Sequence, residues 1–71
     1  MPWIVQDRDT LGGQARIRNT RLSVVFILEC LAQGMSAEDI ALDYPGFPAA
    51  AVPEVLHFAS QALAQEQALA S

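Results

Sequence analysis

Arginines carry the clearest chemistry in this sequence. Arg16, Arg18 and Arg21 lie within ARIRNTRLSV, residues 15–24. A guanidinium group presents a planar fork of donors that fits carboxylates and phosphates. In an extended strand, Arg16 and Arg18 would face one way and Arg21 the other. The three residues are therefore candidate contacts to nucleic acid or to an acidic partner.

A structural role is the alternative for each of these arginines. Arg16 and Arg18 could form the solvated face of a strand. Arg21 could instead bind a helix end or an acid such as Asp39 or Asp43. The sequence leaves both alternatives open.

Trp3 and Thr20 are further candidates near the arginines. Trp3 is either a partner anchor, because interfaces favour tryptophan, or a cover over the core of the domain. In a dimer these two roles would coincide. Thr20 is expected to bond local backbone where strand meets helix.

Catalytic and metal-binding arrangements are not recognisable in the sequence. One histidine, His57, and one cysteine, Cys30, cannot complete a common closed zinc site. The pair Gly12 and Gly13 lacks the lysine and helix start of a phosphate-binding loop. We expect His57 to be partly buried and hydrogen-bonded, and Cys30 to fill the core. The sequence predicts a non-enzymatic protein without a cofactor.

A β-hairpin is predicted to position the arginines. The β-prone run WIVQ, residues 3–6, and the alternating segment 15–24 would form its two strands. Between them Gly12 and Gly13 can adopt the positive φ that a tight turn requires.

Two short helices are predicted next. The first begins at the N-cap Ser23 and ends before Gly34 in the left-handed conformation. The second begins at the N-cap Ser36, with Asp39 at the third helical position as in a capping box, and stops at Pro45.

A third helix is predicted over about residues 49–67. An apolar stripe supports it, formed by Val52, Val55, Leu56, Ala59 and Leu63. Pro53 requires either that the helix proper begins near residue 52 or that a helix beginning near 49 is kinked. The fold class is mainly α in a single domain, 1–71: a hairpin arm (1–21), a three-helix core with helix-turn-helix spacing (22–67) and a frayed end (68–71).

Composition predicts that the chain self-associates. With 71 residues, 52% of them hydrophobic and 17% charged, the chain is too short to bury its apolar surface well on its own. A homodimer or a tight partner complex is expected. No signal peptide or membrane span is recognisable, and a single cysteine is typical of a cytoplasmic protein.

Charge is divided unequally along the chain. Residues 1–21 hold four arginines against two aspartates, a balance of +2, while residues 22–71 hold six acids and no lysine or arginine. Helices without cations would be repelled by the phosphates of a duplex. We therefore expect DNA binding to be weak, or confined to the arginine strand within a larger complex.

An ordered series of short motifs resembles the domain-of-unknown-function family numbered 433, many of whose members are labelled antitoxins. The matching segments are Gly12-Gly13, Ile17-Arg18, Thr20-Arg21, Gly34-Met35-Ser36, Glu38-Asp39-Ile40 and Tyr44-Pro45-Gly46. Asn19 replaces the glycine that the family has before Thr-Arg. Gln14 and Ala15 replace its basic residue and proline, and Pro48 replaces the N-cap of its third helix.

The resemblance implies a homeodomain-like three-helix core behind a β-hairpin. It also implies, through genomic association, an antitoxin-like role beside a toxin that resembles a PIN-type ribonuclease. Three functions remain in consideration: a protein-binding antitoxin-like module, a helix-turn-helix DNA-binding regulator, and a structural dimeric domain.

Overall fold

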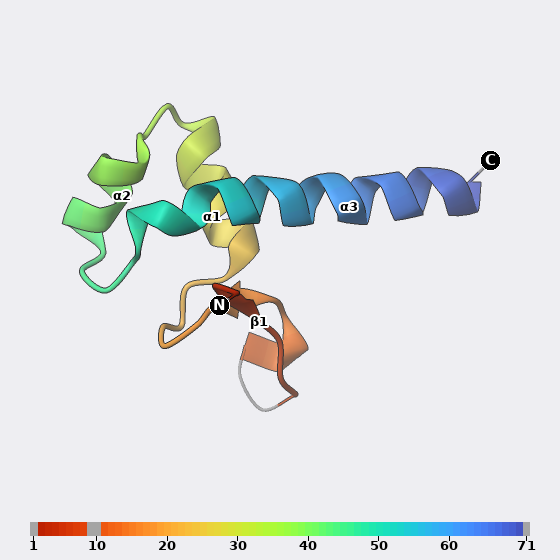
Figure 1. Ribbon diagram of the computed structural model, residues 1–71, viewed down its shortest axis with the longest axis horizontal. Helices are drawn as coiled ribbons and strands as arrows, with labels where there is room; N and C mark the ends of the chain where they lie inside the picture. Colours follow the sequence, from red (N-terminus) through yellow and green to blue (C-terminus); the bar gives the residue numbers. More distant parts are fainter. Residues whose placement is uncertain (1, 9–10, 71) are drawn as a thin grey trace.

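The computed structural model describes residues 2–8 and 11–70 and places a β-hairpin before three helices (Figure 1). The hairpin pairs β1 (Ile4–Val5) with β2 (Arg16–Ile17), and the helices are α1 (Val24–Ala32), α2 (Ala37–Asp43) and α3 (Val52–Ala70). Short 3-10 turns at Leu11–Gly13 and Ala49–Ala51 precede β2 and α3. The predicted fold class, mainly helical with an N-terminal hairpin and a three-helix homeodomain-like core, is confirmed.

The hairpin is antiparallel, with Ile4 opposite Ile17 and Val5 opposite Arg16. Gly12 and Gly13 have φ values of 63° and 86°, so the predicted glycine turn is confirmed. Non-glycine residues rarely adopt this region, which explains why the turn falls at this pair.

The second strand is much shorter than the predicted segment 15–24. It ends at Ile17 because the chain turns through Asn19, whose φ is 65°. The Thr20 amide then donates to the Ile17 carbonyl at 3.1 Å, and the Ile17 amide donates to the Leu22 carbonyl at 2.9 Å. Asparagine tolerates the left-handed region better than most residues, so this position permits a turn that residue alternation alone does not predict.

Local capping sets the bounds of α1. The Ser23 hydroxyl accepts a hydrogen bond from the amide of the third helical residue, as predicted. Gly34 has a φ of 92°, and its amide donates to Leu31 at 3.0 Å while the Met35 amide donates to Cys30 at 3.2 Å. These two bonds form a Schellman motif, which closes the helix and turns the chain toward α2.

A capping box starts α2. The Ser36 hydroxyl accepts from the Asp39 amide at 3.0 Å, and the Asp39 carboxylate accepts from the Ser36 amide at the same distance. This reciprocal pair satisfies two amides that the first helical turn leaves unbonded. The helix ends at Asp43, just before the predicted stop at Pro45.

Helix α3 begins at Val52, after the 3-10 turn, and Pro53 lies in its first turn. A proline there removes no intrahelical hydrogen bond, so no kink is needed. Of the two predicted starts, the one near residue 52 is correct. The helix continues to Ala70, beyond the expected end at 67; residue 71 of the expected frayed end lies outside the described residues.

The core lies where β2 and the three helices meet. Its fully buried large side chains are Ile17, Ile27, Ile40 and Val55. The apolar stripe of α3 is only partly covered: Leu56 is 51% exposed and Leu63 is 58% exposed. Nine residues of α1 span about 14 Å, whereas nineteen of α3 span about 28 Å, so the second half of α3 extends past its neighbours (Figure 1).

Candidate functional site

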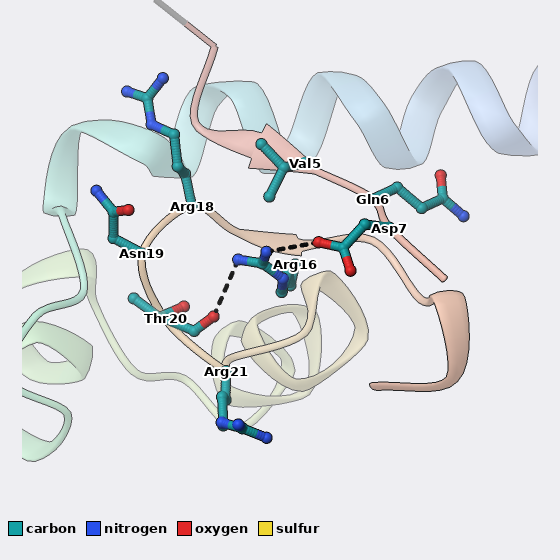
Figure 2. Close-up of a pocket in the computed structure, with 8 residues that line it drawn as sticks. All are labelled: Val5, Gln6, Asp7, Arg16, Arg18, Asn19, Thr20 and Arg21. Atoms are coloured by element: carbon teal, nitrogen blue, oxygen red, sulfur yellow. Dashed lines mark hydrogen bonds and ion pairs between the residues drawn. The ribbon is translucent and has the colours of Figure 1, made fainter. Parts of the chain in front are cut away.

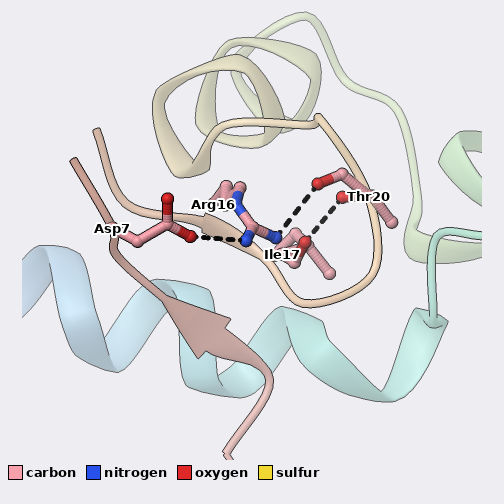
Figure 3. Close-up of polar contacts among 4 residues, drawn as sticks. All are labelled: Asp7, Arg16, Ile17 and Thr20. Atoms are coloured by element: carbon pink, nitrogen blue, oxygen red, sulfur yellow. Dashed lines mark hydrogen bonds and ion pairs between the residues drawn. The ribbon is translucent and has the colours of Figure 1, made fainter. Parts of the chain in front are cut away.

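Arg16 acts as a clamp within the hairpin. Its Nη2 lies 2.8 Å from Asp7 Oδ2, and its Nη1 donates to the Thr20 carbonyl oxygen at 3.2 Å (Figure 3). The side chain is 16% exposed, and its Nε is buried without a hydrogen-bond partner. Arg16 is therefore largely committed to its own chain, and of the two alternatives left open by the sequence the solvated strand face is wrong for this residue.

Arg18 and Trp3, which the sequence suggested separately, lie together. The guanidinium carbon of Arg18 lies 5.4 Å from the centre of the Trp3 ring. The Arg18 amide also donates to the Trp3 carbonyl at 2.7 Å, which continues the hairpin ladder by one more bond. A cation over an indole face is stabilised by about 0.5–1 kcal/mol at an exposed site. Both side chains are partly buried.

Arg21 does not bond a helix end, nor Asp39 or Asp43, so the structural alternative for this residue is wrong. It is exposed and makes no hydrogen bond or ion pair to the described part of the chain. Thr20 bonds the strand–helix junction instead: its hydroxyl donates to the Ile17 carbonyl at 2.7 Å and accepts from the Leu22 amide at 3.1 Å. Arg21 is therefore the arginine of this group that is most available to a partner.

The three arginines surround an open pocket without converging on its centre. Figure 2 shows Arg16 across the middle of the pocket, while Arg18 and Arg21 point outward on opposite sides. An anion site normally aims several donors at one point. This geometry favours separate contacts along an extended surface over a cradle for one small anion.

Glu54 is a positioning residue that the sequence analysis did not single out. Its carboxylate accepts hydrogen bonds from the Trp3 amide at 2.9 and 3.0 Å and from the Ile4 amide at 2.9 Å. These bonds join β1 to the first turn of α3. The Trp3 amide, followed by the Ile4 amide, lowers the pKa of Glu54 below its ordinary value of 4.5. A pairing fifty residues apart in sequence leaves no local signal.

An apolar groove runs beside the exposed part of α3. We call it the α1–α3 groove: α1 contributes Val24, Val25 and Leu28, α3 contributes Phe58, Ala59, Ala62 and Leu63, and the hairpin arm contributes Gln6, Gln14 and Ala15. None of the described residues that line it is charged. Its volume is about 410 Å³. Exposed apolar surface of this kind is typical of interaction sites.

Metal ligands, His57 and Cys30 are the other candidates for chemistry in this sequence. Residues 2–8 and 11–70 contain no group of three side chains able to hold a metal ion. His57 is exposed, contrary to expectation, because it lies on the outer face of α3; its Nε2 is 3.4 Å from the Gln61 amide nitrogen. Cys30 is buried, as predicted. None of the helices described is long and apolar enough to cross a bilayer.

Comparison with known proteins gives a family but no activity. Residues 4–59 match the model of a family described as a protein of unknown function, DUF433. A crystal structure of a DUF433 member protein from Anabaena variabilis is similar, with a TM-score of 0.79 and 30% sequence identity, over 100% of this chain and 71% of that one. A search of curated proteins found no match. The chain belongs to the DUF433 family.

Proposed function

We propose that this chain is a non-enzymatic protein-binding module that serves as the antitoxin-like subunit of a toxin–antitoxin pair. The observation that carries the proposal is the exposure of large apolar side chains on helices that hold no lysine or arginine. Leu42 is 79% exposed on α2, Val25 is 60% exposed on α1 and Leu63 is 58% exposed on α3. Apolar surface beside acids fits a protein partner better than a polyanion.

The character of α3 argues against a groove-reading role. In a homeodomain-like core the third helix is the one that enters the major groove. Here its exposed positions include His57, Gln61, Gln65 and Glu66 and no cation. A DNA-reading helix needs arginine or lysine toward bases and phosphates. The architecture is compatible with a helix-turn-helix, but the side chains favour protein contacts.

The antitoxin-like part of the proposal comes from the family resemblance, which associates such chains with a PIN-like ribonuclease. The first expectation is that a gene next to this one encodes a small PIN-like ribonuclease. The test is then to produce the two proteins together and to follow the pair by size exclusion. We expect one co-eluting complex and RNA cleavage that declines in proportion to added chain. Separate elution with unimpaired cleavage would contradict the antitoxin-like role.

The alternative function, a DNA-binding regulator, is favoured by one observation. Arg18 and Arg21 flank an open pocket on the arm, and Arg21 has no partner among the described residues. Phosphate contacts by such side chains would be weak and strongly dependent on salt. This contact would supplement a protein complex rather than define a specific site.

A further inference from the structure

We propose that the α1–α3 groove binds a second copy of this chain, with the two α3 helices packed antiparallel across a two-fold axis. The inference rests on the proposed protein-binding function and names one partner for it, the chain itself. Three features of the molecule lead to this arrangement.

The first feature is the uncovered half of α3. Every residue from 60 to 68 is exposed, although the helix runs on to Ala70. A helical segment of this length is marginal in water unless packing supports it. Leu63, at 58% exposure, lies within this half and faces the groove. A second helix laid along the groove would bury it.

The second feature is self-complementarity. Phe58 and Leu63 form one wall of the groove and also the ridge of α3. A two-fold axis brings the same surface of each copy against the other. The apolar face of α3 in one copy can therefore line its own groove and also enter the groove of the partner. Since the described residues that line the groove are all uncharged, two copies would meet along them without like-charge repulsion.

The third feature is charge at the two ends of the groove. The distal end of α3 carries Glu66 and no cation in its last turn, and the helix dipole adds partial negative charge there. The proximal end lies against the arm, which Glu54 ties to α3 and which holds every arginine of the chain. Antiparallel packing places the negative end of each α3 beside the partner's positive arm.

Sedimentation velocity of the full chain over about 1–100 µM tests the arrangement, because association then depends on concentration. Leu63→Glu and Val25→Glu place a carboxylate on opposite walls of the groove. Leu42→Glu is the matched control, since Leu42 is 79% exposed on α2 and does not line the groove. We expect dimers for the unmodified chain and for Leu42→Glu. For both groove variants we expect a dimer dissociation constant that is at least about a hundredfold higher.

Melting temperature against concentration gives a second measurement that does not require the dissociated variants to be fully folded. The unmodified chain and Leu42→Glu should melt higher as concentration rises, and the groove variants should lose that dependence. A monomeric unmodified chain, or dimers that persist in both groove variants, would overturn the inference. A monomer that still binds the ribonuclease would overturn the dimer alone, whereas a groove-dependent dimer that binds no ribonuclease would overturn only the antitoxin-like role.

Discussion

Replacing Arg16 should destabilise the fold far more than replacing Arg21, although both arginines lie in the same short segment. Arg16→Ala removes the ion pair to Asp7 and the bond to the Thr20 carbonyl, which together join the segment after β1, β2 and the turn before α1. Arg21→Ala removes an exposed side chain that bonds nothing in the described residues. Comparing the two variants therefore distinguishes an arginine that stabilises the fold from one that is exposed to solvent.

The magnitude follows from the surroundings of each contact. A hydrogen bond from a charged group to the Thr20 carbonyl contributes about 1.5–3 kcal/mol. The pair with Asp7, which is 49% exposed, adds about 0–1 kcal/mol. The unbonded Nε of Arg16 offsets about 1–3 kcal/mol of this sum. We therefore expect Arg16→Ala to cost about 1–2 kcal/mol, against roughly 0.5 kcal/mol or less for Arg21→Ala.

Thermal unfolding followed by circular dichroism measures the difference. For a chain of this size, about 1–2 kcal/mol lowers Tm by roughly 4–16 °C, while Arg21→Ala should leave Tm nearly unchanged. A double-mutant cycle with Asp7→Asn should give a coupling free energy of up to about 1 kcal/mol for the ion pair. Equal melting temperatures for the two alanine variants would refute the assignment of Arg16 as a clamp.

Two further substitutions test contacts that position the helices. Ser36→Ala should cost about 1 kcal/mol of unfolding free energy in urea, because it removes the N-cap of α2; Ser60→Ala, an exposed position on α3, is the control, and equal losses would argue against the capping box. Glu54→Gln should reduce the loss of unfolding free energy that occurs as pH falls into the acid range. Since folding lowers the pKa of Glu54, its contribution is present above the ordinary value of 4.5 and is lost as pH falls through the lower folded value. Unfolding curves from about pH 2 to 7 measure this; a Glu54→Gln variant whose loss at acid pH matches that of Glu66→Gln would contradict the role of the carboxylate.

The helices were predictable because their signals are local. Ser23, Ser36 and Gly34 each act within one turn of their own position, through a side-chain cap or a positive φ. Such contacts depend on nearby residue types and can be recognised without knowledge of the rest of the chain. For the start of α3 the sequence leaves two alternatives. Pro53 is compatible both with a helix that begins near residue 52 and with a kinked helix that begins near residue 49.

The arm was harder to predict because its contacts join distant parts of the chain. The alternation of residues 15–24 predicts a long strand, but the strand ends at Ile17 and the chain turns through Asn19. The hairpin brings Arg16 to Asp7, the turn brings the Thr20 carbonyl to Arg16, and Arg21 is left exposed. The sequence leaves the role of each arginine open, and only the fold shows that Arg16 is bonded within its own chain while Arg21 is exposed. Glu54 carries no local signal of its role, because an acid in the first turn of a helix is already accounted for by the helix dipole. Only the folded chain brings it to the amides of β1.

The measurement that tests most directly the claim that these helices contact protein rather than DNA is titration of duplex DNA with the purified chain, followed by fluorescence anisotropy at about 150 mM salt. A dimer would bring eight arginines, all in the arms, against sixteen acids. The account predicts no saturable binding at this salt, and at low salt only weak binding that requires Arg18 and Arg21 and is unaffected by Gln61→Ala on α3. Sequence-specific nanomolar binding that survives at about 150 mM salt and is abolished by Gln61→Ala would contradict the account and establish the DNA-binding alternative.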